Sequence, residues 1–161
     1  MVIIDAFSKF VEAVPLPDQT SKTVGKALVN FILTHSVPEQ ILSDLGGCFV
    51  SKMMKTLYKA LGVKKLQTTP FHPMCNGQVE NLNSTLYNIL ALIIDKEHTS
   101  WDEFLKFSTF SYNTAIHRST KETPFYLAYG RDPVLPVDGI LDKSSVQNNN
   151  EYVLDLPEYT A

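Results

Sequence analysis

Two carboxylates in this chain have the type and setting of ligands for a divalent cation. Asp44 follows the short apolar run 39–43, and Glu80 lies in an amphipathic stretch that begins at Gly77, so thirty-five residues separate the two acids. Carboxylate oxygens are the ligands that Mg²⁺ and Mn²⁺ prefer, and two such ions about 3.5–4 Å apart catalyse phosphodiester chemistry. A site of that kind normally needs at least three acidic groups to offset the metal charge, and this pair supplies two.

Each acid also has a simpler role. Asp44 stands in a Ser-Asp-x-Gly sequence, which is ordinary turn chemistry. Glu80 would complement the positive end of a helix dipole if it lies in the first turn of its helix. Taken separately, each acid therefore suits a structural role, and only the pair suggests a metal site.

The elements that would position these acids alternate between strands and helices. Residues 2–4 and 10–14 predict a β-hairpin, and 39–43 and 63–68 predict two further strands. Helices are predicted to begin at Thr20 or Ser21, at Ser51, at Gly77, at Ser100 with a capping box to Glu103, and at Thr123-Pro124. This order predicts an α/β fold with a mixed β-sheet flanked by helices.

The helix that begins at Gly77 is the one that carries Glu80. Asn76 is predicted to cap this helix, which would place Glu80 in the first turn. Its apolar positions predict a buried face that includes Val79, Leu82, Leu86, Ile89, Leu90 and Ile93.

Composition narrows the class of protein. The chain has 161 residues, 44% of them hydrophobic, which suits one folded domain. No apolar run is long enough to span a membrane, and the first residues do not resemble a signal peptide. Cys48 and Cys75 are too few for a disulfide framework, so we expect an intracellular, reducing location. There is no Gly-rich phosphate loop and no Gly-x-Ser-x-Gly motif, which argues against those enzyme classes.

Charge is unevenly distributed along the chain. The net charge of −3 argues against a generally basic nucleic-acid binder. Residues 132–161 contain six acids and Lys143 as their single basic residue, so we expect a core-like domain at 1–136 and an acidic, partly flexible tail at 137–161. A local basic stripe comprises Lys52, Lys55, Lys59, Lys64 and Lys65, which suits either a solvated helix face or a contact with phosphates.

Three stretches carry a resemblance to a known family. They read SDLGGCF, TTPFHPMCNGQVENLN and YNTAIHRSTKETPFYLAYGRDP, and in this order they resemble the catalytic core of gypsy-type LTR retrotransposon integrases, from Val2 to about Pro136. The resemblance implies a ribonuclease-H-like fold and an Asp-Asp-Glu triad that binds two Mg²⁺. It also implies an enzyme that trims DNA ends and joins their 3′ hydroxyls to target DNA. Asp44 matches the second Asp of the triad, and Glu80 matches its Glu.

The same resemblance makes Asp5 a structural turn acid. The stretch VIIDAFSKF resembles the family's second strand, so the first strand and the first triad Asp would precede Met1. The chain is therefore expected to be N-terminally truncated and to lack that strand. The family's zinc-binding N-terminal domain and DNA-binding C-terminal domain are likewise expected to be missing.

The sequence also departs from the family near Glu80. Asn81 and Ser84 stand where the family usually has basic residues, which predicts weaker contacts to DNA phosphates. Met74 and Asn76 also replace the usual Gln and Asp. The residues assigned to nucleic-acid contacts are Lys52, Lys55, His72, Asn76 and Gln78.

These observations predict an integrase-core-like protein with a DNA-integration function by metal-dependent phosphoryl transfer, inactive as this isolated chain. Asp44 and Glu80 would bind Mg²⁺ or Mn²⁺, weakly with an incomplete triad. The expected partners are element-end and target DNA and further copies of the chain, with nuclear localisation if it functions. Two alternatives stay open: a non-enzymatic dimerisation or binding module that uses the helix at 100–115, and a metal-dependent nuclease of the same fold in which Asp5 completes the site.

Overall fold

The computed structural model describes residues 1–67, 73–94, 100–135 and 138. It divides into two compact units, Met1–Arg131 and Asp132–Ala161. The second unit is described only at 132–135 and 138, where the Leu135 N–H donates to Asp138 Oδ2 at 2.6 Å. The predicted boundary between 136 and 137 stays a prediction.

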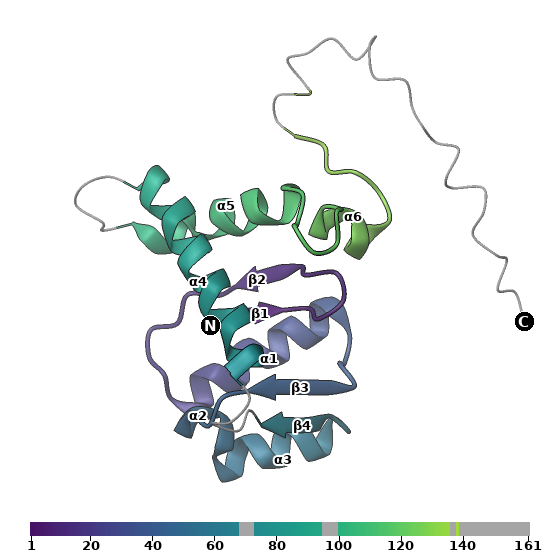
Figure 1. Ribbon diagram of the computed structural model, residues 1–161. Coiled ribbons are helices and arrows are strands. Elements are labelled where there is room, and N and C mark those ends of the chain that lie inside the picture. The colour runs from purple at the N-terminus through teal and green to yellow at the C-terminus, as the bar shows by residue number, and fades with distance from the viewer. Residues whose placement is uncertain (68–72, 95–99, 136–137, 139–161) are drawn as a thin grey trace, which may run out of the picture. The chain divides into compact units, whose positions relative to one another are not determined.

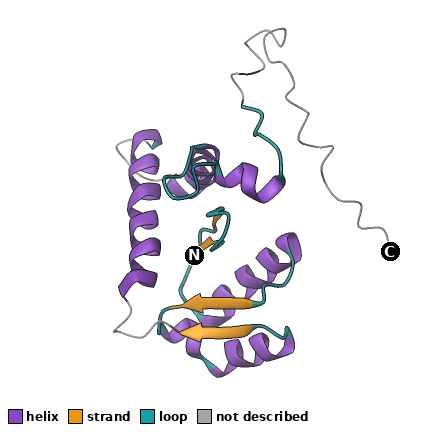
Figure 2. Cartoon of the chain, turned by 45° about the vertical axis from the view of Figure 1, so that its right-hand side comes forward, coloured by secondary structure: helices purple, strands orange, loops and turns teal. Residues whose placement is uncertain are grey.

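The strands of the first unit form two pairs (Figures 1 and 2). β1 (Val2–Ile4) and β2 (Val11–Ala13) are antiparallel, with Ile4 opposite Val11. β3 (Gln40–Ser43) and β4 (Lys64–Gln67) are parallel, with Ser43 opposite Gln67. Parallel and antiparallel strand pairs are both present, as predicted. Within the described residues they form two separate sheets, because no strand joins β1 to β3.

Six helices lie in the described part of the chain. They are α1 (Ser21–His35), α2 (Gly47–Val50), α3 (Lys52–Ala60), α4 (Pro73–Ile93), α5 (Trp101–Thr114) and α6 (Pro124–Tyr129). Hydroxyl caps start three of them: Thr20, Ser51 and Thr123 each accept a hydrogen bond from a backbone N–H three residues on. No helix in these ranges is long and apolar enough to cross a membrane.

The start of α4 corrects the prediction for the helix that carries Glu80. The helix begins at Pro73, not Gly77, because proline suits the first helical position, where its missing N–H has no intrahelical partner in any case. Asn76 therefore lies inside the helix and is not its cap. Glu80 lies beyond the first turn, which weakens its predicted role as a dipole-complementing acid.

Two further local predictions were wrong. Ser100 precedes α5, but its side chain makes no capping hydrogen bond, so the capping box is not formed. Val79 and Ile93 of α4 are 37% and 38% exposed instead of buried. The buried face of α4 is thus shorter than the apolar pattern suggested.

The buried residues form two clusters, one for each sheet. The first joins α1, α3 and the residue before β4, and comprises Val24, Leu28, Ile32, Met54, Tyr58 and Val63. The second joins β2 to α4 through Val11, Leu82 and Leu86, with Tyr112 of α5 packed against it. Asp44 thus follows a strand whose Ile41 packs on the first cluster, and Glu80 lies on a helix anchored in the second.

A buried side chain on α5 occupies the outer edge of β2. Asn113 Oδ1 accepts a hydrogen bond from the Val11 N–H at 2.9 Å, and Asn113 Nδ2 donates to the Val11 carbonyl at 2.8 Å. Asn113 is 5% exposed and Val11 1% exposed, so water cannot replace either bond. One amide therefore pairs with the strand as a neighbouring strand would.

Replacing Asn113 by Ala is expected to destabilise the fold strongly. The change leaves the Val11 N–H and C=O buried without partners, and each such group costs about 1–3 kcal/mol. Urea denaturation of the wild type and the variant measures the difference. Asn88→Ala, on the exposed side of α4, is the control and should change stability little; equal effects of the two changes would contradict the role assigned to Asn113.

Candidate metal and nucleic-acid site

Asp44 lies at the carboxyl end of β3, where α2 begins. It is exposed, and its Oδ1 accepts a hydrogen bond from the Gly46 N–H at 3.0 Å. That bond closes the turn and fixes the carboxylate at the edge of the sheet. Since β3 and β4 are parallel, their carboxyl ends share this edge, which is where open α/β sheets bind ligands.

Glu80 is placed by its backbone alone, in α4, because its side chain lies outside the described residues. The chain from the end of β4 to the start of α4 can span at most about 20 Å, so α4 begins near the edge that carries Asp44. Figures 1 and 2 show that α4 begins at the side of the sheet toward which β3 and β4 point.

The other predicted contact residues divide into two groups. Lys52 and Lys55 lie exposed on α3, and Lys52 is the first residue of that helix. His72 lies outside the described residues, as do the side chains of Asn76 and Gln78. Their predicted contacts with nucleic acid therefore stay predictions.

The described residues supply one of the carboxylate ligands that a divalent-cation site needs. Asp44 offers a carboxylate at a solvent-accessible strand end, the donor type that suits Mg²⁺ or Mn²⁺. No group of three or more potential ligands occurs among the residues that the structure describes. Asp44 can therefore contribute to a cation site, but it does not make one with its described neighbours.

Lys65, a member of the basic stripe named in the sequence, lies beside this edge on a strand and not on a helix face. Lys65 of β4 donates from Nζ to Ser43 Oγ and to the Leu66 carbonyl. Burial lowers the pKa of Lys65, and the negative charge of Asp44 partly offsets that effect. The parallel register brings Lys65 to Asp44, and a register between two short strands cannot be read from the sequence.

Asp5 has the hydrogen bonds of a turn acid. Its Oδ2 accepts from both the N–H and the Oγ of Ser8 at 2.7 Å, and its backbone pairs with Phe10 and Lys9 across the hairpin. Burial by itself would raise the pKa of Asp5, but the hydrogen bonds from Ser8 and Phe7 and the positive charge of Lys9 together outweigh that effect and hold the pKa below its usual value of 3.8.

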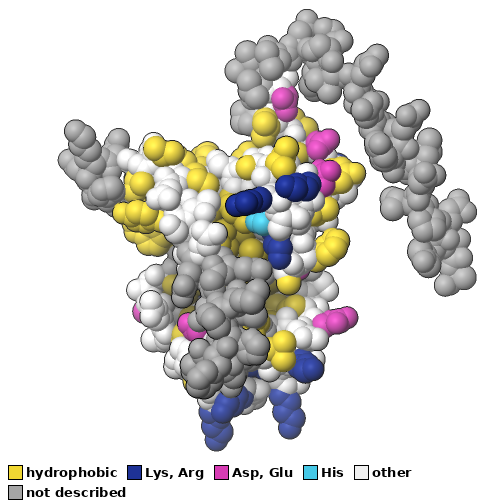
Figure 3. All heavy atoms as spheres, viewed as in Figure 1, with side chains coloured by type: hydrophobic (Ala, Val, Ile, Leu, Met, Phe, Trp, Pro, Cys, Tyr) yellow, Lys and Arg dark blue, Asp and Glu magenta, His cyan; other side chains and the backbone are white. Residues whose placement is uncertain are grey.

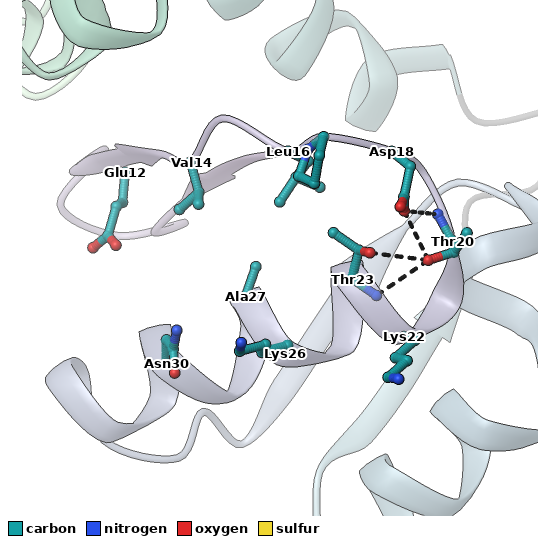
Figure 4. A pocket seen from close by; sticks show the side chains of 11 residues that line it. Glu12, Val14, Leu16, Asp18, Thr20, Lys22, Thr23, Lys26, Ala27 and Asn30 are labelled. Atoms are coloured by element: carbon teal, nitrogen blue, oxygen red, sulfur yellow. Dashed lines mark hydrogen bonds between the residues drawn. The ribbon is translucent and has the colours of Figure 1, made fainter.

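A groove of about 550 Å³ lies between α1 and the segment that follows β2 (Figure 4). Its lining carries both charges, with Glu12 and Asp18 as well as Lys22 and Lys26. Asp18 already accepts two hydrogen bonds from Thr20, at 2.9 and 2.7 Å. These polar groups stabilise the start of α1, and the mixed charge favours no single class of ligand.

Comparison with known proteins supports the resemblance. The family model of the integrase core domain matches residues 1–73, which include Asp44. The retrovirus-related Pol polyprotein from transposon 412 of Drosophila melanogaster is 28% identical over 84% of this chain. Mouse gypsy retrotransposon integrase-like protein 1 is 27% identical over 83%. The chain resembles the catalytic core of integrases.

Solved integrase cores have the same fold. The catalytic core domain of BIV integrase superposes with a TM-score of 0.67 at 26% identity, over 80% of this chain and 84% of that one. The HTLV-2 integrase catalytic core domain in complex with magnesium superposes with a TM-score of 0.67 at 20% identity, over 80% and 82%. The predicted ribonuclease-H-like α/β fold is therefore confirmed.

The integrase-like chain matches only part of its relatives. It spans 11% of the transposon 412 polyprotein and 26% of the mouse protein. The activity, substrates and partners of those longer proteins are therefore only proposed for this chain.

Replacing Asp5 by Asn is expected to lower stability at pH 7 and to leave Mg²⁺ binding unchanged. Because the folded pKa of Asp5 is depressed, its stabilisation is present above the unfolded value and is lost as the pH falls through the folded value. The stability difference between wild type and variant should therefore narrow in acid. Denaturation at several pH values and calorimetric Mg²⁺ titration measure the two effects.

The control for Asp5→Asn is Glu39→Gln, which removes an exposed acid and should change neither the stability nor the Mg²⁺ binding. Loss of Mg²⁺ binding in the Asp5 variant would favour the nuclease in which Asp5 is a ligand.

Proposed function

We propose that this chain is part of an integrase core that binds DNA and catalyses phosphoryl transfer between DNA strands with the help of divalent cations. The observation that carries the proposal is the position of Asp44 at the carboxyl end of β3, in a fold that superposes on integrase catalytic cores. Glu80 on α4 is the second proposed ligand. A protein that joins DNA ends to target DNA acts where that DNA is, so nuclear localisation is part of the proposal.

The proposed roles follow from the chemistry of each group. A bound Mg²⁺ would supply Lewis acidity at the reacting phosphodiester. Asp44 and Glu80 would hold it through carboxylate oxygens, and the Gly46 N–H would keep Asp44 oriented. The lysines Lys52 and Lys55 would contact DNA phosphates, which positions the duplex without reading its sequence.

A two-cation mechanism needs a third acid beyond Asp44 and Glu80. Within the described residues β3 pairs only with β4, so its other edge is open to a further strand. A strand that pairs there and bears an acid at its end would place a carboxylate next to Asp44. We propose that this chain needs such a strand from a longer protein for strand transfer.

The chain by itself is expected to join donor to target DNA little or not at all in Mg²⁺ or Mn²⁺, because two carboxylates do not offset the charge of two cations. A strand-transfer assay measures this, with a version extended by the upstream coding sequence beside it. Gain of activity in the extended version, lost again on Asp44→Asn, would support the proposal. Robust Mg²⁺-dependent joining by this chain alone, abolished by Asp44→Asn, would contradict it.

A second candidate function is self-association through α4 and α5. Exposed aromatic side chains of α5 include Phe107 and Phe110, at 60% and 40% exposure, and Leu92 of α4 is 87% exposed. Figure 3 shows hydrophobic side chains gathered over these two helices. Exposed apolar area of this kind marks protein interfaces, and the occupant we propose is a second copy of this chain, as in the oligomers that integrases form.

Phe107→Glu is expected to shift the chain from dimer to monomer, because a buried unpaired carboxylate opposes association. Sedimentation velocity over a range of concentrations measures the change. Phe7→Glu, which alters a phenylalanine that is 77% exposed in the β1–β2 turn, is the matched control and should leave the dimer intact. A wild-type chain that is monomeric at the highest concentration would exclude the dimer.

A further inference from the structure

A pocket of about 450 Å³ lies between α2, α3 and β4. Three of its lining residues are lysines, and the others are apolar or aromatic: the set is Phe49, Val50, Lys55, Tyr58, Lys59, Val63 and Lys65. No acid is among them. A hollow whose charged lining residues are all positive attracts an anion.

None of the three lysines around this pocket forms a salt bridge in the described part of the chain, although Asp44 acts on Lys65 from a longer distance. Lys55 and Lys59 are one helical turn apart on α3, a spacing at which like charges repel. The ion pair found among the described residues is elsewhere, between Glu12 and His35. Basic side chains gather at the lower edge of Figure 3, where Figure 1 places α3. A bound anion would relieve this repulsion.

Lys65 is held in place at the wall of the pocket. Its Nζ lies 5.9 Å from the centre of the Tyr58 ring and 6.0 Å from that of Phe49, as in cation–π pairs. Its hydrogen bonds to Ser43 and Leu66 use two of the three ammonium protons. The third proton is left for a ligand.

Tyr58 supplies a second observation that is independent of the lysines. The residue is 3% exposed, and its Oη is buried with no hydrogen-bond partner among the described residues. Buried polar groups are nearly always paired, so an orphan hydroxyl needs a reason. Burial raises the pKa of Tyr58, so Oη keeps its proton near neutral pH and can donate it in a hydrogen bond.

We propose that this pocket binds a phosphate oxyanion, with Lys55 and Lys59 as counter-charges and Lys65 and Tyr58 as hydrogen-bond donors. The phosphate comes either from a DNA strand or from free phosphate in solution, and its assignment to DNA rests on the function proposed above. Because Lys65 also bonds to Ser43, a phosphate held here lies beside the strand end that carries Asp44.

Inorganic phosphate is the first probe, with sodium chloride at equal ionic strength as the reference. Phosphate is expected to raise the unfolding midpoint of the wild-type chain above that in chloride, because a ligand that binds only the folded state stabilises it. The double change Lys55→Gln with Lys59→Gln should remove this rise. The pair Lys22→Gln with Lys26→Gln, with the same spacing on α1, should keep it.

Tyr58→Phe separates binding from packing. It keeps the ring and removes only the hydroxyl, which has no partner in the free protein. The unfolding midpoint in chloride should therefore be unchanged or higher, while the rise caused by phosphate should fall by half or more. No rise in the wild type, or an equal loss in the α1 control, would overturn the pocket; a Tyr58→Phe variant that keeps the full rise would overturn the role of Oη.

A short DNA duplex is the second probe, with affinity measured by fluorescence anisotropy at several salt concentrations. If the pocket takes a backbone phosphate, the Lys55/Lys59 double variant should lower the slope of log affinity against log salt by about one relative to the α1 control. If the salt slope is unchanged and phosphate still raises the unfolding midpoint, the pocket binds free phosphate, and the proposal that it binds a DNA phosphate is wrong. Absence of wild-type DNA binding would instead refute the function proposed above, and the phosphate result would still decide the pocket.

Discussion

The pairing of Asn113 with Val11 is the contact on which the second half of the fold depends. The two residues are 102 positions apart, and both hydrogen bonds of the amide go to one strand residue. The Val11 side chain packs on Leu82 and Leu86, which follow Glu80 on the same helix. One residue of a three-residue strand thus holds α5 through its backbone and α4 through its side chain. The hairpin would be marginal alone, and this double anchorage makes it the point from which Glu80 is positioned.

The two proposed cation ligands are anchored in different hydrophobic clusters. Asp44 follows β3, whose Ile41 packs on the cluster of α1 and α3, whereas Glu80 belongs to the cluster of β2 and α4. Met1 and Leu16, at the two ends of the hairpin, are partly buried against the first cluster and so connect the halves. A cation shared by both acids would therefore bridge two separately packed bodies. The binding free energy of this cation would then include the cost of holding the two clusters at a fixed separation. An additional strand paired with β3 would reduce that cost.

The sequence predicted what depends on local chemistry and missed what depends on distant neighbours. The helix caps at Thr20, Ser51 and Thr123, the hairpin and the resemblance to integrase cores could all be read from it, and so could the place of Asp44 just after a strand. The early start of α4 was missed because a proline is common both in loops and at the first position of a helix, so Pro73 alone does not distinguish the two. The bond of Asn113 to Val11 and the approach of Lys65 to Ser43 depend on packing and register between segments far apart in the chain, and neither has a local signal.

Lys65 connects the electrostatics of the proposed phosphate pocket to those of Asp44. The negative charge of Asp44 acts on Lys65, and a divalent cation at Asp44 would be repelled by the positive charge of that lysine. An oxyanion bound to Lys65 in the proposed pocket would offset that repulsion, so phosphate in the pocket and metal at Asp44 would favour one another. Such coupling is reciprocal: whatever factor phosphate adds to metal affinity, metal adds to phosphate affinity. A net charge of −3 therefore does not argue against the proposed binding of a polyanion, because binding depends on how the charges are arranged locally.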